Sequence, residues 1–362
     1  MKRELVFLVC VVLSSCASTG LTSGQHGSTK IIYTGWDNKD TMYISDHAKE
    51  IDSIGTFNGI GIDIAIDRQK WAAGSKSTDN KLGWNLLSKK SFHYSDFSLT
   101  VDDLKTARLV NLTENLFPVV LSSGFNAKLS WFDDQRWAVV FSNFDTLAKI
   151  MRDTGTKNVI LDPEGYNDEA LFDYETQNTR YANTFKKYYD RVRWTGQQVA
   201  LMFRDNLEQF HVLALYGYTL SAINKKYDLL PAFYDGILDV LTKGSTFTDG
   251  YEQAYTFKKF DQFKTGAQKI RDAKSLSGNK EAYDKFVKVG FGLWPDYKGN
   301  MTYFSPSDWF KSLVYAKSIA GRFVWVYSEK MPMLKETKDN ANHLEILRKI
   351  MSQSQRKESR HE

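Results

Sequence analysis

Residues 158–166 read Asn-Val-Ile-Leu-Asp-Pro-Glu-Gly-Tyr, an apolar, β-branched run that ends in two carboxylates one residue apart. Side chains alternate along a strand with a period of two, so Asp162 and Glu164 should point in the same direction. Two carboxylates that share a partly desolvated site repel each other, and we expect the pKa of at least one to be raised. A carboxyl group with a raised pKa can serve as a general acid near neutral pH.

Acidic and aromatic residues recur at the ends of other predicted strands. Single acids at such positions often cap the following helix, and Asp37 and Asp249 are open to that interpretation. Caps do not require Trp or Tyr, so the recurrence favours one shared site. We predict catalytic roles for Glu164, Glu252, Asp162 and Glu329. We predict substrate-binding roles for Trp36, Asp37, Asp63, Tyr166, Tyr216, Asp249, Trp294, Asp296 and Trp325.

Carboxylates interleaved with aromatic rings are typical of a carbohydrate site. Sugar rings present C–H faces that stack on aromatic planes, while their hydroxyl groups need polar acceptors. Glycoside hydrolysis needs two carboxyl groups flanking the scissile bond. One donates a proton to the leaving oxygen, and the other attacks the anomeric carbon or activates a water molecule. We expect Glu164 to be the acid, with Glu252 as its partner and Glu329 as the alternative partner.

Eight strand–helix alternations surround these residues and predict a (β/α)8 TIM barrel with a long insertion after strand 2. An open, doubly wound sheet is the alternative, but no Gly-rich phosphate fingerprint follows the first strand. The expected strands are residues 30–36, 57–66, 115–121, 157–161, 212–218, 245–248, 286–293 and 322–327. The expected helices are residues 40–53, 132–154, 178–209, 229–241, 251–272, 305–320 and 344–351, with a short helix at 100–110 inside the insertion.

The first residues resemble a bacterial lipoprotein leader. Lys2 and Arg3 precede a short apolar segment that ends in Leu13-Ser-Ser-Cys16, which is similar to a lipobox whose Cys becomes lipidated. We therefore expect a signal peptide at 1–15, a flexible tether at 16–29, a barrel at 30–335 and a C-terminal helix with a basic tail at 336–362. The resemblance implies a lipid-anchored protein of the bacterial cell envelope.

Composition narrows the other possible functions. The formal net charge of +5 is small for 362 residues, so we do not expect nucleic-acid binding. Both cysteines, Cys10 and Cys16, lie in the leader, which leaves no thiolate for a metal site or disulfide in the fold. The histidines lack zinc-binding spacing, and we predict no metal and no cofactor. Oligomeric state is left open.

The strand-end motifs together resemble barrel glycoside hydrolases, especially a group of bacterial glycosidase-like barrels. The residues that carry the resemblance are Gly35-Trp-Asp37, Asp162-Pro-Glu-Gly-Tyr166, Asp249-Gly-Tyr-Glu252 and Trp325-Val-Tyr-Ser-Glu329. The similarity spans about residues 30–330 and implies activity on a polysaccharide. The pattern of Asp162, Glu164 and Trp325 is also loosely similar to that of chitinase-type barrels. Chitinases carry a longer, Asp-rich run before the position of Asp162, and this chain lacks that run.

Two functions follow from the sequence. The first is a glycoside hydrolase that acts on a poly- or oligosaccharide. The second is a non-catalytic, glycan-binding lipoprotein on a degenerate barrel. We expect Trp71, Trp84 and Trp131 to pack in the core, with a role in extending the binding cleft as the alternative.

Overall fold

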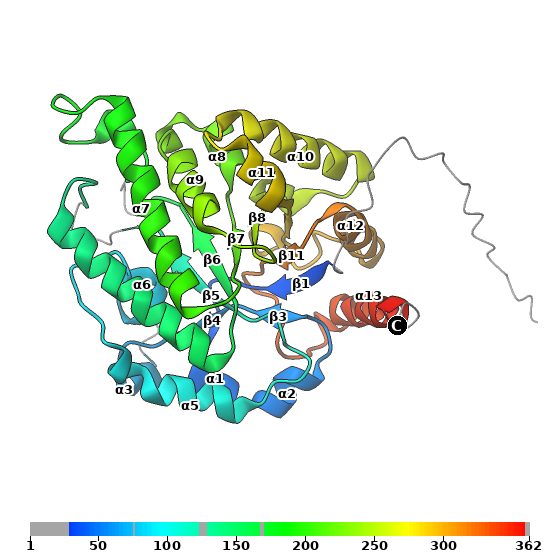
Figure 1. The fold of residues 1–362 in the computed structure, drawn as a ribbon. Coiled ribbons are helices and arrows are strands. Elements are labelled where there is room, and N and C mark those ends of the chain that lie inside the picture. The colour runs from blue at the N-terminus through cyan, green and yellow to red at the C-terminus, as the bar shows by residue number, and fades with distance from the viewer. Residues whose placement is uncertain (1–28, 75–76, 123–128, 167–169, 359–362) are drawn as a thin grey trace, which may run out of the picture.

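The computed structural model describes residues 29–74, 77–122, 129–166 and 170–358 (Figure 1). Its central feature in these ranges is a set of parallel strands with eight positions. They are β1 (Lys30–Tyr33), β3 (Gly59–Ile60) continued by β4 (Ile62–Asp63), β5 (Leu116–Val120), β6 (Asn158–Asp162), β7 (His211–Ala214), β8 (Thr246–Asp249), β9 (Val287–Val289) continued by β10 (Phe291–Leu293), and β11 (Phe323–Val326). A two-residue strand, β2 (Lys39–Asp40), pairs with β4.

The strand pairing closes on itself. One sheet has the order β10-β11-β1-β3 and another the order β5-β6-β7-β8-β9, and all of these pairs are parallel. Gly61, between β3 and β4, forms a parallel bridge to Leu116 in β5. On the other side, β9 pairs with β8 and β10 pairs with β11, so one interrupted strand joins the two sheets. The fold is therefore the predicted (β/α)8 barrel.

Helices surround the strands (Figure 1). The main ones are α6 (Asp134–Thr154), α7 (Phe185–Asn206), α9 (Leu230–Val240), α10 (Phe260–Asp272), α12 (Pro306–Ile319) and α13 (Ala341–Glu358). Smaller helices are α1 (Thr41–Asp46), α2 (Ala48–Ser53), α5 (Ser98–Ala107), α8 (Tyr218–Ile223) and α11 (Lys280–Phe286). Helix α7 begins after Thr184, whose side chain accepts a hydrogen bond from the Lys187 backbone N–H, and its buried Val192, Val199 and Phe203 face the core.

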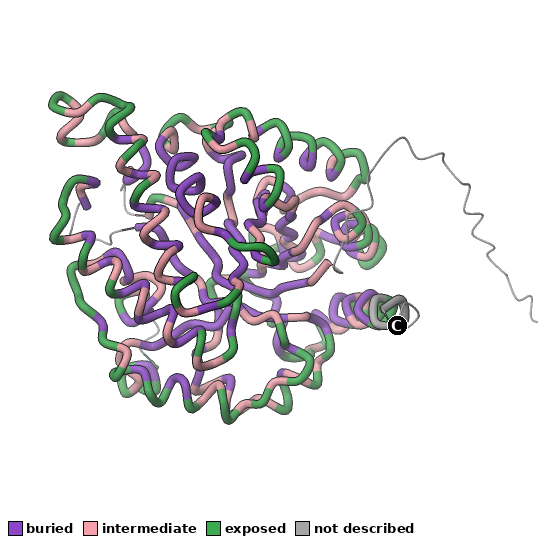
Figure 2. The backbone as a smooth tube through the Cα atoms, viewed as in Figure 1, coloured by how far each residue is buried: buried purple, intermediate pink, exposed green. Residues whose placement is uncertain are grey.

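Burial follows this layered arrangement, with buried backbone at the centre and exposed residues outside (Figure 2). The barrel interior is packed by side chains from several strands and is not a channel. Its fully buried cluster consists of Ile32, Leu116, Ile160, Leu213, Phe323 and Trp325. This plug forms a rigid floor beneath the carboxyl ends of the strands.

Several predicted elements differ from the structure, among them the helix expected at 178–209, which is α7 and spans only Phe185–Asn206. The expected helix 40–53 is two short helices, because His47 has a non-helical φ of −113° and separates α1 from α2. The expected helix 251–272 starts later, since Tyr251 has a left-handed φ of 41° and a 3-10 turn, Glu252–Thr256, precedes α10. The last helix is longer than predicted and packs beside α12, and its Arg348 donates to the carbonyl of Ile54, which follows α2, at 3.0 Å.

The insertion after strand 2 is confirmed and contains more structure than expected. Besides α5 it carries α3 (Arg68–Ala72), α4 (Leu82–Asn85) and 3-10 turns. Helix α4 packs very closely on β5: a Cβ added at Gly83 would lie 1.9 Å from the Pro118 carbonyl oxygen. Only glycine permits this approach, and it brings the flanking residues of α4 to the barrel mouth.

The predicted leader, including Cys16, lies outside the described residues, and the domain bounds proposed from sequence remain predictions. Across the part of the chain that is described, no helix combines the length and apolar character that a bilayer crossing requires.

Candidate active site

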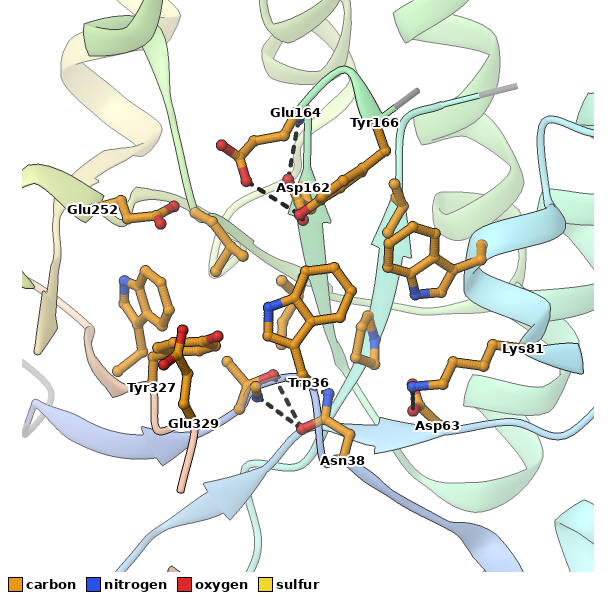
Figure 3. A pocket seen from close by; sticks show the side chains of 18 of the residues that line it. Trp36, Asn38, Asp63, Lys81, Asp162, Glu164, Tyr166, Glu252, Tyr327 and Glu329 are labelled. Carbon is orange, nitrogen blue, oxygen red and sulfur yellow. Dashed lines mark hydrogen bonds and ion pairs between the residues drawn. The ribbon is translucent and has the colours of Figure 1, made fainter. Parts of the chain in front are cut away.

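A pocket of about 280 Å³ opens at the carboxyl ends of the strands. Five carboxyl groups line it, from four strand ends: Asp63, Asp162, Glu164, Glu252 and Glu329. Seven aromatic rings line it as well: Trp36, Trp84, Tyr166, Tyr255, Trp294, Trp325 and Tyr327. Figure 3 shows Glu164, Glu252 and Glu329 reaching the same space from different sides.

Asp162 and Glu164 do point the same way, as the strand alternation predicts. The Tyr166 hydroxyl donates to both, at 2.8 Å from Asp162 Oδ2 and 3.1 Å from Glu164 Oε2 (Figure 3). The Glu164 backbone N–H also donates to Asp162 at 3.0 Å. Burial, followed by the charge of Glu164, raises the pKa of Asp162 to about 7. Burial also raises the pKa of Glu164, and the hydrogen bond from Tyr166 opposes that rise.

Glu252 is more deeply buried than Glu164. Burial raises its pKa to about 9, and the charges of Glu164 and Asp162 add to the effect. Tyr255 donates a side-chain hydrogen bond that opposes the rise. The pKa of each of these three carboxyl groups, Asp162, Glu164 and Glu252, is thus raised, as expected for a site of acid–base chemistry.

Asp63 is paired with a lysine that the sequence patterns did not single out. Lys81 Nζ, from the insertion, lies 2.7 Å from Asp63 Oδ2, and both side chains are buried. Burial raises the pKa of Asp63 to about 6, and Lys81 opposes that rise through its charge and its hydrogen bond. Lys81 is the cation that lines the described pocket, and its charge is engaged by Asp63.

Glu329 reaches the pocket from the loop after β11. Buried Asp296 fixes this loop, because its carboxylate accepts hydrogen bonds from the backbone N–H groups of Glu329, Lys330 and Met331 at 3.2, 2.6 and 2.9 Å. Asp296 therefore orients Glu329 from behind the pocket wall.

Comparisons with known proteins place this geometry in context. No family model matches the chain, and no curated protein matches its sequence. Solved structures align at low similarity. One is a 3-keto-D-glucoside 4-epimerase from E. coli, at 11% identity and a TM-score of 0.44, covering 90% of this chain and 99% of that one. Another is a GH18 chitinase from Pseudoalteromonas aurantia, at 10% identity and a TM-score of 0.44, covering 90% and 99%. A GH5-4 endoglucanase from Clostridium acetobutylicum aligns at 10% identity and a TM-score of 0.40, covering 85% and 89%.

The aromatic residues of the pocket form two groups. The first, which we call the aromatic wall, consists of Trp36, Trp84 and Tyr166, whose ring centroids lie 4.9–5.7 Å apart. The second consists of Tyr255, Trp294, Trp325 and Tyr327, with centroids 4.9–5.7 Å apart in the contacting pairs. The carboxyl groups lie in the pocket that these two groups line.

The prediction for Trp84 was wrong, since we expected core packing and the ring lines the pocket. Trp71 and Trp131 are buried, as predicted. Trp325 is also fully buried, and its indole N–H donates to the Gly250 carbonyl at 2.8 Å, so its ring forms part of the pocket floor.

Four predicted binding residues do not line the pocket. Asp37 is exposed and pairs with Lys39 at 2.5 Å. Asp249 and Asp296 are fully buried, and their carboxylates are occupied by hydrogen bonds from the protein, so we correct their predicted role from binding to support. Tyr216 is not among the lining residues, and its backbone carbonyl accepts a hydrogen bond from Tyr234; burial and then the charge of Glu252 raise its pKa.

Several pocket residues escaped the sequence analysis, namely Thr34, Asn38, Lys81, Tyr255 and Tyr327. Thr34 and Asn38 hydrogen-bond to each other at 3.2 Å and shape the turn after β1. Tyr327 belongs to the Trp-x-Tyr-x-Glu pattern, so strand alternation from Trp325 was a usable signal for it. Lys81 and Tyr255 carry no such signal, because they lie in an insertion and in a 3-10 turn.

Among the residues that the structure describes, no three His, Cys, Asp or Glu side chains are arranged to hold one metal ion. The predicted absence of a metal and a cofactor stays a prediction. What the pocket offers is coupled carboxyl groups and aromatic surfaces, which suit proton transfer on a ligand with both hydroxyl groups and apolar faces.

Proposed function

We propose that this protein is a glycoside hydrolase that cleaves O-glycosidic bonds of a poly- or oligosaccharide. The observation that carries the proposal is the position of Glu164 and Glu252, two carboxyl groups from the ends of different strands, in one pocket lined by aromatic rings. Two carboxyl groups flanking one bond are the requirement for this reaction. Aromatic surfaces supply the stacking that holds a sugar ring.

In the proposed reaction, Glu164 donates its proton to the glycosidic oxygen as the bond from that oxygen to the anomeric carbon breaks. Glu252, as the carboxylate, either attacks the anomeric carbon or removes a proton from the attacking water molecule. Water is consumed, and its hydrogen atoms end on the new hydroxyl groups of the two products. Asp162, bound to the Glu164 backbone and to Tyr166, tunes Glu164.

The pKa of Glu252 depends on the protonation state of its neighbours, because their charges act on it. The charge of Glu164 helps to raise the pKa of Glu252, so a proton on Glu164 makes Glu252 easier to ionise. Burial is the larger cause and keeps the pKa of Glu252 raised even then, so Glu252 as the acid and Glu164 as the carboxylate is the alternative assignment, which the rescue experiment below separates. Glu329, which lines the same pocket, is the alternative partner.

The test is turnover of a glycan panel by the wild type, Glu164→Gln and Glu252→Gln. Glu164→Gln should lower kcat on an unactivated glycan by about 10²–10⁴, the usual worth of proton donation. A substrate with an activated leaving group should rescue it in part, and should not rescue Glu252→Gln. Rescue of Glu252→Gln alone would reverse the two roles. Binding of glycans by the wild type without turnover would favour the glycan-binding lipoprotein instead.

We also propose that the protein is lipid-anchored in a bacterial cell envelope through Cys16, on the evidence of Leu13-Ser-Ser-Cys16. Lipidation needs the thiol, so Cys16→Ser should move the protein from the detergent phase to the aqueous phase after phase separation, or leave it unprocessed. Cys10→Ser is the matched control and should partition like the wild type. Cys16→Ser protein in the detergent phase at wild-type levels would contradict the anchor.

A further inference from the structure

The aromatic wall stands at the open side of the pocket. The Trp36 side chain is 53% exposed, whereas Trp325 in the opposite aromatic group is fully buried. Trp36 lies 5.5 Å from Trp84 and 5.7 Å from Tyr166, measured between ring centroids, so a wide apolar surface faces outward where the pocket opens. Such an exposed ring, supported from behind by two others, is suited to stacking against a ligand.

The wall is connected directly to the candidate acid. Tyr166 is both a wall residue and the donor to Glu164, with 3.1 Å between its hydroxyl and Glu164 Oε2 (Figure 3). Glu252, in contrast, is hydrogen-bonded to Tyr255 of the opposite aromatic group. A sugar ring on the wall is thus beside Glu164, and a ring in the deeper part is beside Glu252.

The wall is built partly by the barrel and partly by the insertion. Trp84 is carried by α4 of the insertion, and the contact of Gly83 with the Pro118 carbonyl fixes that helix against β5. The barrel supplies Trp36 and Tyr166 from the loops after β1 and β6. The insertion therefore completes the aromatic wall, whereas Glu164 and Glu252 are positioned by the strand ends of the barrel.

The charges around the wall select against an acidic sugar. Asp162 and Glu164 are the ionisable partners of Tyr166, and Lys81 is held by Asp63 at 2.7 Å. An anionic group on the wall would add negative charge beside two carboxyl groups whose pKa is already raised, with no free cation among the described pocket residues to balance it, which is unfavourable at short range.

We infer that Trp36, Trp84 and Tyr166 form the subsite for the leaving part of the substrate, and that this part is an uncharged pyranose stacked on Trp36. The inference rests on the proposed function and goes beyond it, because it gives the pocket a direction: the sugar whose anomeric carbon reacts occupies the deep, buried side, and the departing sugar occupies the mouth.

The experiment compares two substrates with the same reacting sugar. One is a neutral oligosaccharide that the wild type cleaves, and the other is the corresponding glycosyl fluoride, which lacks a leaving sugar. Trp36→Ala should lower kcat/KM on the oligosaccharide about tenfold, equivalent to roughly 1.4 kcal/mol. The fall in kcat/KM on the fluoride should be at least five times smaller, which is about twofold or less. Trp36 is exposed, so the variant should fold, and its melting temperature checks this.

Trp194→Ala is the matched control, since Trp194 is 39% exposed on α7 and does not line the pocket. It should behave as the wild type on both substrates. An oligosaccharide with a uronic acid in the leaving position should be a poorer substrate than its neutral counterpart.

Three results would overturn the inference. Equal losses on both substrates would place the reacting sugar on Trp36. Wild-type kinetics of Trp36→Ala would show that Trp36 forms no subsite. A preference for the uronate would show that the subsite does not select an uncharged sugar. A wild type that turns over neither substrate would instead show that the proposed hydrolase function fails, and the leaving-group subsite with it.

Discussion

At the scale of single residues, buried carboxylates that never touch the pocket hold the loops that carry pocket glutamates. Asp249 accepts hydrogen bonds from the Thr219 hydroxyl at 3.1 Å and from the Gly217 and Tyr251 backbone N–H groups at 3.3 and 3.2 Å. Tyr251 adopts a left-handed φ of 41° immediately before Glu252. Asp249 thus stabilises an unfavourable turn that aims Glu252 into the pocket.

We predict that Asp249→Asn loses activity through Glu252. The amide keeps one acceptor oxygen but replaces the other with a donor that faces backbone N–H groups, so the turn should loosen. We expect kcat to fall about tenfold or more with KM little changed, and stability to fall by ~1–3 kcal/mol. Steady-state kinetics and thermal unfolding measure the two effects.

Asp235→Asn is the matched control. Asp235 is also fully buried and accepts from Tyr218, Tyr189 and Gly278 at 2.9, 2.7 and 2.7 Å, but it lies on α9 and does not line the pocket. It should lose a similar amount of stability and keep its activity. Equal loss of activity in both variants would mean that Asp249 acts only on the fold.

At the scale of elements, helix α4 is the part of the insertion on which the pocket depends. It begins just after Lys81 and contains Trp84, and its position is set by the contact between Gly83 and β5. A segment absent from the minimal barrel thus contributes both a buried cation and an aromatic ring to the site.

We predict that Gly83→Ala displaces α4. The new Cβ would lie 1.9 Å from the Pro118 carbonyl oxygen, which is far inside van der Waals contact, and this backbone cannot move freely within the sheet. We expect a loss of ~1–3 kcal/mol in unfolding free energy and a weaker affinity for glycans, measured by calorimetry. Leu99→Ala, at a 57% exposed position of α5 in the same insertion, should change neither. Wild-type affinity in a folded Gly83→Ala variant would show that α4 does not shape the pocket.

At the scale of the whole molecule, the carboxyl cluster links folding to pH. The pKa is raised to about 7 for Asp162 and to about 9 for Glu252, whereas both groups ionise near pH 4 in an unfolded chain. Between those values the native state binds more protons than the unfolded state, so their stabilising contribution is complete at low pH and is lost as pH rises. His211 has the opposite sign: burial lowers its pKa to about 3, and its contribution is complete above about pH 6.5.

We therefore predict that the unfolding free energy falls between pH 7 and 9, by roughly 1–3 kcal/mol, since one extra bound proton is worth about 1.4 kcal/mol per pH unit. Denaturant unfolding at a series of pH values measures this slope. Glu252→Gln should flatten it, because the amide does not titrate. A wild-type slope in Glu252→Gln, or stability that rises over this range, would contradict the assignment.

The sequence by itself determined the barrel and the location of its chemistry. Apolar strand runs and amphipathic helices alternate by local rules, and parallel strands must place their ends at one edge, so acids after strands meet at one mouth. Strand alternation was also sufficient to place Asp162 and Glu164 on the same side.

Tertiary structure decided which strand-end residues reach the pocket. Periodicity stops where a strand stops, and beyond that point the contacts of the folded loops, some local and some long-range, set the direction of each side chain. Asp37 turned toward Lys39, Asp249 and Asp296 turned toward backbone N–H groups, and Lys81 arrived from the insertion. The raised pKa of Glu252 likewise comes from burial and from the charges of Glu164 and Asp162, which are distant in sequence and adjacent only in the folded barrel.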